Sequence, residues 1–492
     1  MNQNDLNEKI AKLEAFIEKH LEKHPIPGLS VCARQGGEEV FCKQYGVRSS
    51  KGDKGDKGGN VSKVDRDTIF GIASMSKGVT CAALAILASE GKLSFDDRVD
   101  KYLPTLKIKG VPRESLKLWH LATHTSGLPP LPLLAWSIAW HSSYADSSGT
   151  KEKRKAESTS RVAALADIID YINTGTYPTL GQPGIMSSYS NDSFALLSAI
   201  ADIAAGEPLE DFLRERVFLP LGMEHTGLYA DPLKARELGV VTELFEKDEK
   251  KEDGKFTSDD YWDVAPPYRG CGYVLSTASD MAKFYEALCL KKLPGAELLY
   301  GSRFAELPDA STSAMGLVKR PFKHSGVVHR IAEHAGGLRG VATKGGFVQG
   351  SDGISAAVLT NWGDSSITPI LNAIYSILLG YEPDAPHFFW PLPQGQTITE
   401  PLAYTGQYHQ DERFSDDVVI IERGGKLYRP EEDEDNKGAI KETELLYCDG
   451  TRFIASGACP LEQRDTYEFL PDDRGYVTRL RQGSRVYTRV GL

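Results

Sequence analysis

The sequence changes character once, at a proline-dense stretch. Residues 383–397, PDAPHFFWPLPQGQT, contain four prolines, which is typical of a linker. Before this stretch, helical patterns of apolar residues alternate with strand-like runs, and after it short alternating strands are joined by Gly or Asp-Gly turns. The chain is therefore predicted to be of the α+β class. A large unit is expected over residues 1–382, and a separate antiparallel β barrel or sandwich over residues 398–492.

Length and charge exclude several classes of protein. A chain of 492 residues is long enough for two or three domains. Its 68 acidic and 57 basic side chains give a formal net charge of −11, which disfavours nucleic acid or an anionic membrane as the main partner. No run of about 20 apolar residues predicts a membrane helix. The partner that we expect is a small molecule, and the sequence predicts no oligomeric state.

The amino-terminal segment and the cysteines bear on location. Five apolar residues between Leu6 and Leu21 recur at helical spacing, which predicts an amphipathic surface helix that ends before Pro25. The first 28 residues lack the apolar core of a secretory signal. The seven cysteines are an odd number without a CxxC pair, which is typical of reduced thiols. These features predict a cytoplasmic protein.

Several further elements are predicted within the large unit. They are two strands over residues 28–47 around a Gly-Gly turn, a helix from Ala73 to Gly91, a helix from about Asp192 to Ala205, and strands at 340–348 and 354–361. The polar repeat at 51–60 and the charged run at 151–155 are expected to be solvated.

Two familiar catalytic motifs are absent. The sequence contains neither the G-x-S-x-G of α/β-hydrolases nor the H-E-x-x-H of zinc proteases. His120 and His124 have the spacing of a metal-binding pair, but the residues between them are Leu-Ala-Thr and offer no catalytic glutamate. We interpret this pair as packing residues, and no metal or other cofactor is predicted.

A Ser-x-x-Lys motif marks the candidate nucleophile. The motif begins at Ser74, Ser89 and Ser148, but only Ser74 opens a predicted helix. Residues three apart on a helix share a face, so that the Lys77 ammonium can reach the Ser74 hydroxyl. The positive end of the helix favours a developing oxyanion, and a lysine of lowered pKa can take the serine proton. On these residues alone, a capping serine beside a solvated lysine stays open as an alternative.

The motifs that follow resemble those of a known family. The run FGIASMSKGVTCAALAILASEGKLSFDDRVDKYLP resembles the nucleophile helix of serine β-lactamases and penicillin-binding proteins, notably the class C type and its esterase relatives. HLATHTSGLP, QPGIMSSYSNDSF, RGCGYVLSTASDM and EHAGGLRG then follow in the order of the family, over roughly residues 25–375. The resemblance implies an antiparallel sheet flanked by helices, an all-helical region, and an appended small β domain.

The resemblance also implies roles for individual residues. Ser74 would be the nucleophile that accepts the acyl group, Lys77 its hydrogen-bonded partner, and Tyr189 the group that transfers protons. Asn191 would orient Lys77 and the substrate. If residues 189–191 are extended, Tyr189 and Asn191 point the same way, because side chains two apart lie on one side of a strand.

A third motif, His334-x-Gly336, takes the place of the Lys-Thr-Gly of the family on the strand that edges the active site. The N–H groups of Gly337 and Ser74 are expected to form an oxyanion hole. Histidine is mostly neutral at pH 7, whereas the lysine supplies a positive charge for the carboxylate of a β-lactam. Efficient β-lactam hydrolysis is therefore not expected, and Arg339 is a candidate for the missing cation.

The insert at residues 128–183 lies where the family places loops that frame the cleft. Its aromatic residues Trp136, Trp140 and Tyr144 would either form a lid against an apolar substrate or pack as a minor core under a long loop. Trp136 and Trp140 are therefore candidate pocket residues.

Together these observations predict a serine hydrolase that acts on an ester or amide of a small molecule through an acyl-Ser74 intermediate. Acyl transfer to an alcohol or amine, and hydrolysis of D-amino-acid peptides or amides, would use the same residues and stay open. The C-terminal strands show no second constellation of catalytic residues, so that a structural or gating role is expected for them. A non-catalytic binding protein of this fold would be expected to lack Ser74, Lys77 or Tyr189, and all three are present.

Overall fold

The structure is a computed structural model of the full chain. It describes residues 3–50, 61–145, 161–229, 232–247, 256–259, 262–301, 311–324, 326–363, 366–385, 391–395, 398–412, 416–432, 438–457, 461 and 464–491. The polar repeat at 51–60 and the charged run at 151–155 lie outside these residues. The linker predicted at 383–397 is described only in part, so that the predicted domain boundaries stay a prediction.

An eight-stranded antiparallel sheet joins the two ends of the large unit. β1 (Gly28–Gln35) and β2 (Glu38–Ser49) form the predicted hairpin, whose Gly36 and Gly37 have φ values of 65° and 88°. β1 also pairs with β13 (Ser355–Thr360), and the strand order is β3-β2-β1-β13-β12-β11-β10-β9. The remaining strands are β3 (Ser62–Lys63), β12 (Val341–Val348), β11 (Val327–Leu338), β10 (Val318–His324) and β9 (Thr312–Ser313).

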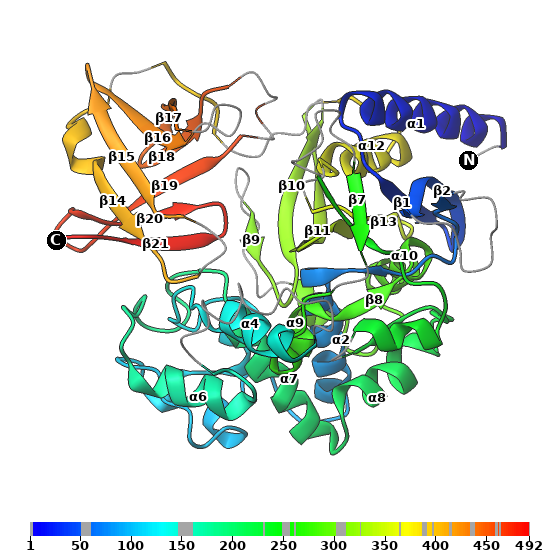
Figure 1. Ribbon diagram of the computed structural model, residues 1–492, viewed down its shortest axis with the longest axis horizontal. Coiled ribbons are helices and arrows are strands. Elements are labelled where there is room, and N and C mark those ends of the chain that lie inside the picture. Colours follow the sequence, from blue (N-terminus) through cyan, green and yellow to red (C-terminus); the bar gives the residue numbers. More distant parts are fainter. Residues whose placement is uncertain are drawn as a thin grey trace.

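Helices cover both faces of this sheet (Figure 1). Val31 of β1 is buried with α1 (Gln3–Lys23) and α12 (Thr368–Leu378), whereas its neighbour Cys32 is buried on the side of α10 (Ala278–Cys289). Successive side chains of a strand point to opposite faces, and both faces of β1 are buried. The continuous burial of residues 28–33 of β1 follows from this double coverage.

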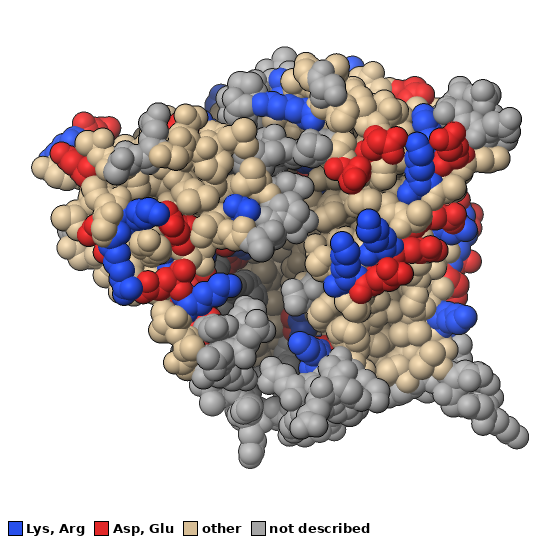
Figure 2. Space-filling view, turned by 90° about the horizontal axis from the view of Figure 1, so that it is seen from above, with Lys and Arg blue, Asp and Glu red and all other residues tan. Residues whose placement is uncertain are grey.

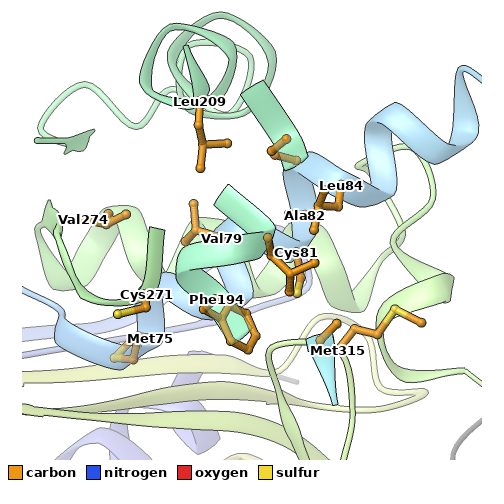
Figure 3. Close-up of a cluster of buried hydrophobic side chains, with 14 of the residues drawn as sticks. Met75, Val79, Cys81, Ala82, Leu84, Phe194, Leu209, Cys271, Val274 and Met315 are labelled. Atoms are coloured by element: carbon orange, nitrogen blue, oxygen red, sulfur yellow. The ribbon is translucent and has the colours of Figure 1, made fainter. Parts of the chain in front are cut away.

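A helical region lies beside the sheet and carries the Ser-x-x-Lys motif. α2 (Ser76–Ser89) is buried along most of its length, and Figure 3 shows its Val79 and Ala82 among side chains that include Phe194 and Leu209. The other helices are α3 (Leu118–Ala122), α4 (Leu133–Ala145), α6 (Leu165–Thr174), α7 (Asn191–Ala205), α8 (Leu209–Leu213), α9 (Arg269–Gly272) and α11 (Glu297–Tyr300). Because α2 is packed on several sides, its first turn is held firmly.

Two small sheets complete the large unit. β4 (Phe70–Gly71), β8 (Val274–Ser276) and β5 (Gly227–Leu228) form one in the order β4-β8-β5, and β6 (Leu244–Lys247) pairs with β7 (Phe256–Asp259). β4 leads directly into the candidate nucleophile.

The carboxy-terminal strands close into an antiparallel barrel, which is one of the two predicted forms. Its interior is filled by apolar and aromatic side chains such as Tyr408, Phe453 and Phe469. The strands are β14 (Gly406–His409), β15 (Val418–Arg423), β16 (Lys426–Glu432), β17 (Ile440–Asp449), β18 (Arg452–Ala455), β19 (Thr466–Pro471), β20 (Val477–Gln482) and β21 (Arg485–Arg489). In Figure 1 the barrel stands beside the sheet and the β20–β21 end faces the helical region.

Two further observations concern the helices and the cysteines. No helix within the described residues is both long enough and apolar enough to span a membrane. No disulfide joins the cysteines that the structure describes.

Candidate active site

Ser74 lies in a strained turn just before α2 and not in the α-helix itself. The turn, a 3-10 helix over Ala73–Met75, begins with Ala73 at a φ of 44°, a left-handed conformation that is rare for a residue other than glycine. The Ser76 hydroxyl donates to the Ala73 carbonyl at 2.6 Å and accepts from the Val274 N–H at 3.0 Å. The backbone around Ser74 is thereby held in one conformation.

Lys77 is fully buried and is hydrogen-bonded to the candidate nucleophile. Its Nζ atom lies 2.9 Å from Ser74 Oγ and 2.9 Å from the carbonyl oxygen of Cys271. The solvated lysine of the alternative interpretation is therefore not what the structure contains. The Cys271 carbonyl, on α9, is a partner that the sequence analysis did not identify.

The ring of Tyr189 lies beside Lys77 and against the imidazole of His124. Its ring centroid is 4.8 Å from Lys77 Nζ, and His124 stacks against the ring with centroids 4.4 Å apart. His124 Nδ1 accepts the N–H of Ser190 at 3.1 Å, so that it also holds the backbone next to the tyrosine. Burial, and then the Lys77 charge, lowers the pKa of His124. His124 thus has the predicted packing role, and the side chain on which it packs is Tyr189.

Asn191 does not make the contact that we expected. Its Nδ2 atom donates to Glu412 Oε1 at 3.0 Å, and Glu412 lies beyond β14 in the barrel region. Asn191 lines the cavity and begins α7, one residue before the predicted start at Asp192. The cap of α7 is Ser190, because its hydroxyl accepts from the Ser193 N–H.

Two glycines let β11 edge the site closely. A Cβ atom at Gly336 would lie 2.3 Å from the Ile72 carbonyl oxygen and 2.4 Å from Thr343 Oγ1, so that only glycine allows β11 to approach the turn of Ser74. A Cβ atom at Gly337 would meet nothing within 4 Å, because this residue borders open space. Gly337 therefore leaves room for a substrate against the strand.

His334 is a neutral group on β11, the strand that edges the site. It is buried, and burial together with the Lys77 charge lowers its pKa to about 4. Its Nδ1 atom lies 2.5 Å from the carbonyl oxygen of Ala335. Above about pH 5 the imidazole therefore carries no charge toward a substrate.

Ser74 opens onto a cavity of about 640 Å³, a size typical of small-molecule sites. Five of the other predicted residues line it: Tyr189, Asn191, His334, Gly336 and Gly337. Arg339 also lines it, but its guanidinium pairs with Glu246 at 2.6 Å and Asp259 at 3.0 Å. The cation that we expected from Arg339 is thus already neutralised by two carboxylates.

The predicted pocket position of Trp136 and Trp140 is corrected by the structure. The described lining of the cavity includes Leu134 of α4 but neither tryptophan. Trp136 packs edge-on against Tyr171 with ring centroids 5.4 Å apart, and the Trp140 ring lies 5.5 Å from the Arg161 guanidinium. These contacts fit the minor-core alternative. The side chain of Tyr144 lies outside the described residues.

The barrel supplies part of the cavity wall, which the sequence analysis did not predict. Ser484 and Arg485 line the cavity at the β20–β21 turn, and the Ser484 carbonyl accepts the Tyr189 N–H at 2.8 Å. The Arg485 guanidinium lies 5.0 Å from the Tyr189 ring centroid and pairs with Glu412. An arginine in an ordinary hairpin turn gives no sequence signal of this position.

Sequence comparison identifies proteins that are similar to this chain. A sequence model of the Beta-lactamase family matches residues 13–372. Penicillin-binding protein 4* of Bacillus subtilis is 27% identical over 281 residues, which are 56% of this chain and 55% of that protein. The D-alanyl-D-alanine-carboxypeptidase/endopeptidase AmpH of Escherichia coli is 27% identical over 224 residues, 44% of this chain and 48% of that protein. The chain thus spans about half the length of these relatives.

Solved structures share the fold at low identity. The crystal structure of SurE gives a TM-score of 0.66 at 17% identity and covers 99% of both chains. The octameric penicillin-binding protein homologue of Pyrococcus abyssi gives 0.63 at 20% identity and covers 97% of this chain and all of that one. The D-amino acid amidase of Ochrobactrum anthropi gives 0.55 at 19% identity and covers 76% and 97%. With its family match and its Ser74–Lys77 pair, the chain belongs to the Beta-lactamase family of serine hydrolases.

Proposed function

We propose that this protein hydrolyses an ester or amide bond of a small molecule through a covalent acyl-Ser74 intermediate. The observation that carries the proposal is the 2.9 Å hydrogen bond between the buried Lys77 ammonium and Ser74 Oγ, beside a cavity of about 640 Å³. A serine hydroxyl becomes nucleophilic when a neighbouring group takes its proton.

In the proposed reaction, Ser74 Oγ attacks the carbonyl carbon of the substrate. Tyr189 takes the serine proton and returns it to the leaving alcohol or amine, while Lys77 keeps its hydrogen bond to Ser74 Oγ. Lys77 Nζ and the Arg485 guanidinium lie 4.8 and 5.0 Å from the centroid of the Tyr189 ring. The N–H groups of Ser74 and Gly337 would stabilise the tetrahedral oxyanion. Water then releases the acid from Ser74.

The charges around the cavity favour an uncharged acyl group. His334 is neutral, Arg339 is paired with two carboxylates, and Arg485 is paired with Glu412. A substrate carboxylate would therefore compete with carboxylates of the protein for each arginine. These pairs support simple esters and amides as substrates and disfavour β-lactams.

Hydrolysis of D-amino-acid amides or peptides is a second candidate. It is supported by the relative named as a D-alanyl-D-alanine-carboxypeptidase/endopeptidase and by the likeness to a D-amino acid amidase. Rates on D- and L-alanine p-nitroanilide would separate this activity from a plain esterase. Acyl transfer would be seen as a new amide or ester when an amine or alcohol is added to the reaction.

The surface supports a small molecule as the main partner. Figure 2 shows basic and acidic side chains intermixed over the described part of one face, an arrangement that disfavours a polyanion. We further propose that neither nucleic acid nor a membrane is the main partner.

A fluorophosphonate probe tests the proposed mechanism. The probe should label the wild-type protein once, and peptide mass mapping should place the adduct on Ser74. Ser89→Ala is the matched control, because Ser89 begins a second Ser-x-x-Lys and its hydroxyl donates to the Ile86 carbonyl of its own helix. Labelling should persist in Ser89→Ala and vanish in Ser74→Ala. Undiminished labelling of Ser74→Ala would contradict the proposal.

A further inference from the structure

Two thiols lie opposite each other on the amino-terminal hairpin, outside the active site. Cys32 of β1 and Cys42 of β2 are directly paired in the antiparallel register. Directly opposed residues have Cα atoms about 4.5–5.5 Å apart, which falls in the range that a disulfide spans. The two sulfur atoms and a carboxylate oxygen of Glu39 lie within 4.8 Å of one another. None of these three residues lines the catalytic cavity.

The two thiols differ in exposure and in acidity. Cys32 is fully buried, whereas Cys42 is partly exposed. A hydrogen bond between them lowers the pKa of Cys42 and raises that of Cys32. The pKa of Cys42 stays lowered although burial and the Glu39 charge raise it, because the Arg66 charge and the Gln44 amide, which donates to Cys42 Sγ at 3.4 Å, also favour a thiolate there. An accessible, more acidic thiol beside a buried second thiol is the arrangement of a reactive cysteine and the cysteine that resolves it.

The neighbouring carboxylate is already engaged, which argues against a metal site. Both oxygens of Glu39 accept hydrogen bonds from Arg66 at 2.6 Å, and one also accepts from the Ser279 hydroxyl at 3.0 Å. A metal ion would have to displace this arginine to gain a third ligand. Among the described residues, no fourth His, Cys, Asp or Glu joins the group.

We propose that Cys32 and Cys42 are a peroxide-responsive thiol pair that closes to an intrachain disulfide. The Cys42 thiolate attacks a hydroperoxide, the O–O bond breaks, and Cys42 sulfenic acid forms while the peroxide leaves as an alcohol or water after taking up a proton. Cys32 then attacks the Cys42 sulfur, the S–O bond breaks, and the leaving hydroxide takes the Cys32 proton and departs as water. Two thiols are oxidised and one peroxide is reduced.

Peptide mapping of the full chain tests this proposal directly. The protein, cleared of metal with a chelator, is treated with graded hydrogen peroxide, alkylated and digested with trypsin, which cleaves between the two cysteines at Arg34. We expect a linked pair of peptides that carry Cys32 and Cys42. Cys42 should react at least about tenfold faster than Cys271, which is buried and whose pKa burial raises to about 11.

Two variants and a metal titration complete the test. Cys32→Ser should leave Cys42 as a sulfenic acid that dimedone traps, and Cys42→Ser should leave Cys32 unmodified at the same peroxide concentration. Esterase activity should be unchanged in both. The proposal is overturned if the linked peptides do not form in the wild-type protein, or if Cys42 is no more reactive than Cys271. Protection of both thiols by one equivalent of zinc would instead identify a metal site and also overturn it.

Discussion

One wall of the cavity is formed by Ser74 and β11, with the buried Lys77 hydrogen-bonded to Ser74, all within the residues that match the family. Another wall is the β20–β21 turn of the barrel, outside that match. The first wall is rigid. Ala73 has a strained φ of 44°, and Gly336 allows an approach that any side chain would block. The barrel wall meets the other through the Ser484 carbonyl and the Arg485 side chain.

This difference separates two kinds of contribution. Ser74 and Lys77 are held by packing and backbone strain inside one wall, whereas Tyr189 contacts both walls. The barrel adds a charge beside Tyr189 and a carboxylate, Glu412, on Asn191. We therefore expect large losses of turnover from changes in the first wall. Changes in the barrel wall should give smaller losses of turnover and larger changes in stability.

The largest loss is expected for Lys77→Ala. Without the ammonium that bonds Ser74 Oγ, kcat/KM on a p-nitrophenyl ester should fall by about 10³-fold. Lys92→Ala is the control, because Lys92 ends the second Ser-x-x-Lys and is exposed, and it should keep wild-type turnover. Retention of more than a tenth of wild-type activity in Lys77→Ala would remove the lysine from the mechanism.

The next largest loss is expected for Tyr189→Phe. Loss of the phenol should lower kcat by about 10²-fold or more if it transfers protons. The ring that stacks on His124 is kept, so that the thermal midpoint should not change. Tyr171→Phe, at a tyrosine that packs on Trp136, serves as the control. Equal activity of Tyr189→Phe and wild type would show that the tyrosine has only a packing role.

Arg485→Met tests the barrel wall. Removing one charge at 5.0 Å from the Tyr189 ring should lower kcat by about tenfold. It also leaves the buried Glu412 carboxylate without its positively charged partner, which should cost about 3 kcal/mol of stability. The double variant with Glu412→Gln should regain stability but not activity. Arg429→Met, at a barrel arginine outside the cavity lining, is the control. Recovery of activity with stability would reduce Arg485 to a structural residue.

The last prediction is a pH dependence of stability at His334, with no loss of turnover at pH 7. Its pKa in the folded state is about 4, below the ordinary value of 6.5. The unfolded chain therefore binds a proton between these values when the folded chain does not, and stability falls as pH drops from 6.5 toward 4. The loss should reach at most about 3 kcal/mol. Urea unfolding of wild type and His334→Gln at pH 7 and 4.5 should show a smaller difference between the two pH values in the variant. Identical differences would contradict a buried neutral His334.

Much of the wall that holds Ser74 and β11 could be predicted from sequence because its signals are local. Ser74 and Lys77 lie one helical turn apart, and the paired glycines of residues 336 and 337 mark a strand that a neighbour or a substrate approaches closely. The alternating strands after residue 398 likewise predicted a barrel or sandwich, since their periodicity does not depend on distant contacts.

The remaining features depend on contacts between residues far apart in the sequence. Asn191 bonds Glu412 across more than two hundred residues, and no local pattern specifies that the barrel will lie there. Arg485 has the surroundings of a surface hairpin in the sequence and becomes a cavity residue only when the β20–β21 end of the barrel packs against the segment that precedes α7. Trp136 and Trp140 were equally compatible with a lid or a minor core, because amphipathic spacing does not tell which surface covers a helix.

Intact-protein mass spectrometry during turnover tests the acyl-Ser74 intermediate most directly. The protein is mixed with an excess of a p-nitrophenyl ester and quenched in acid at successive times. We expect a single added acyl group that maps to Ser74, forms at least as fast as kcat and decays at a rate no slower than kcat. An acyl adduct that decays more slowly than turnover, or full turnover by Ser74→Ala, would contradict the account.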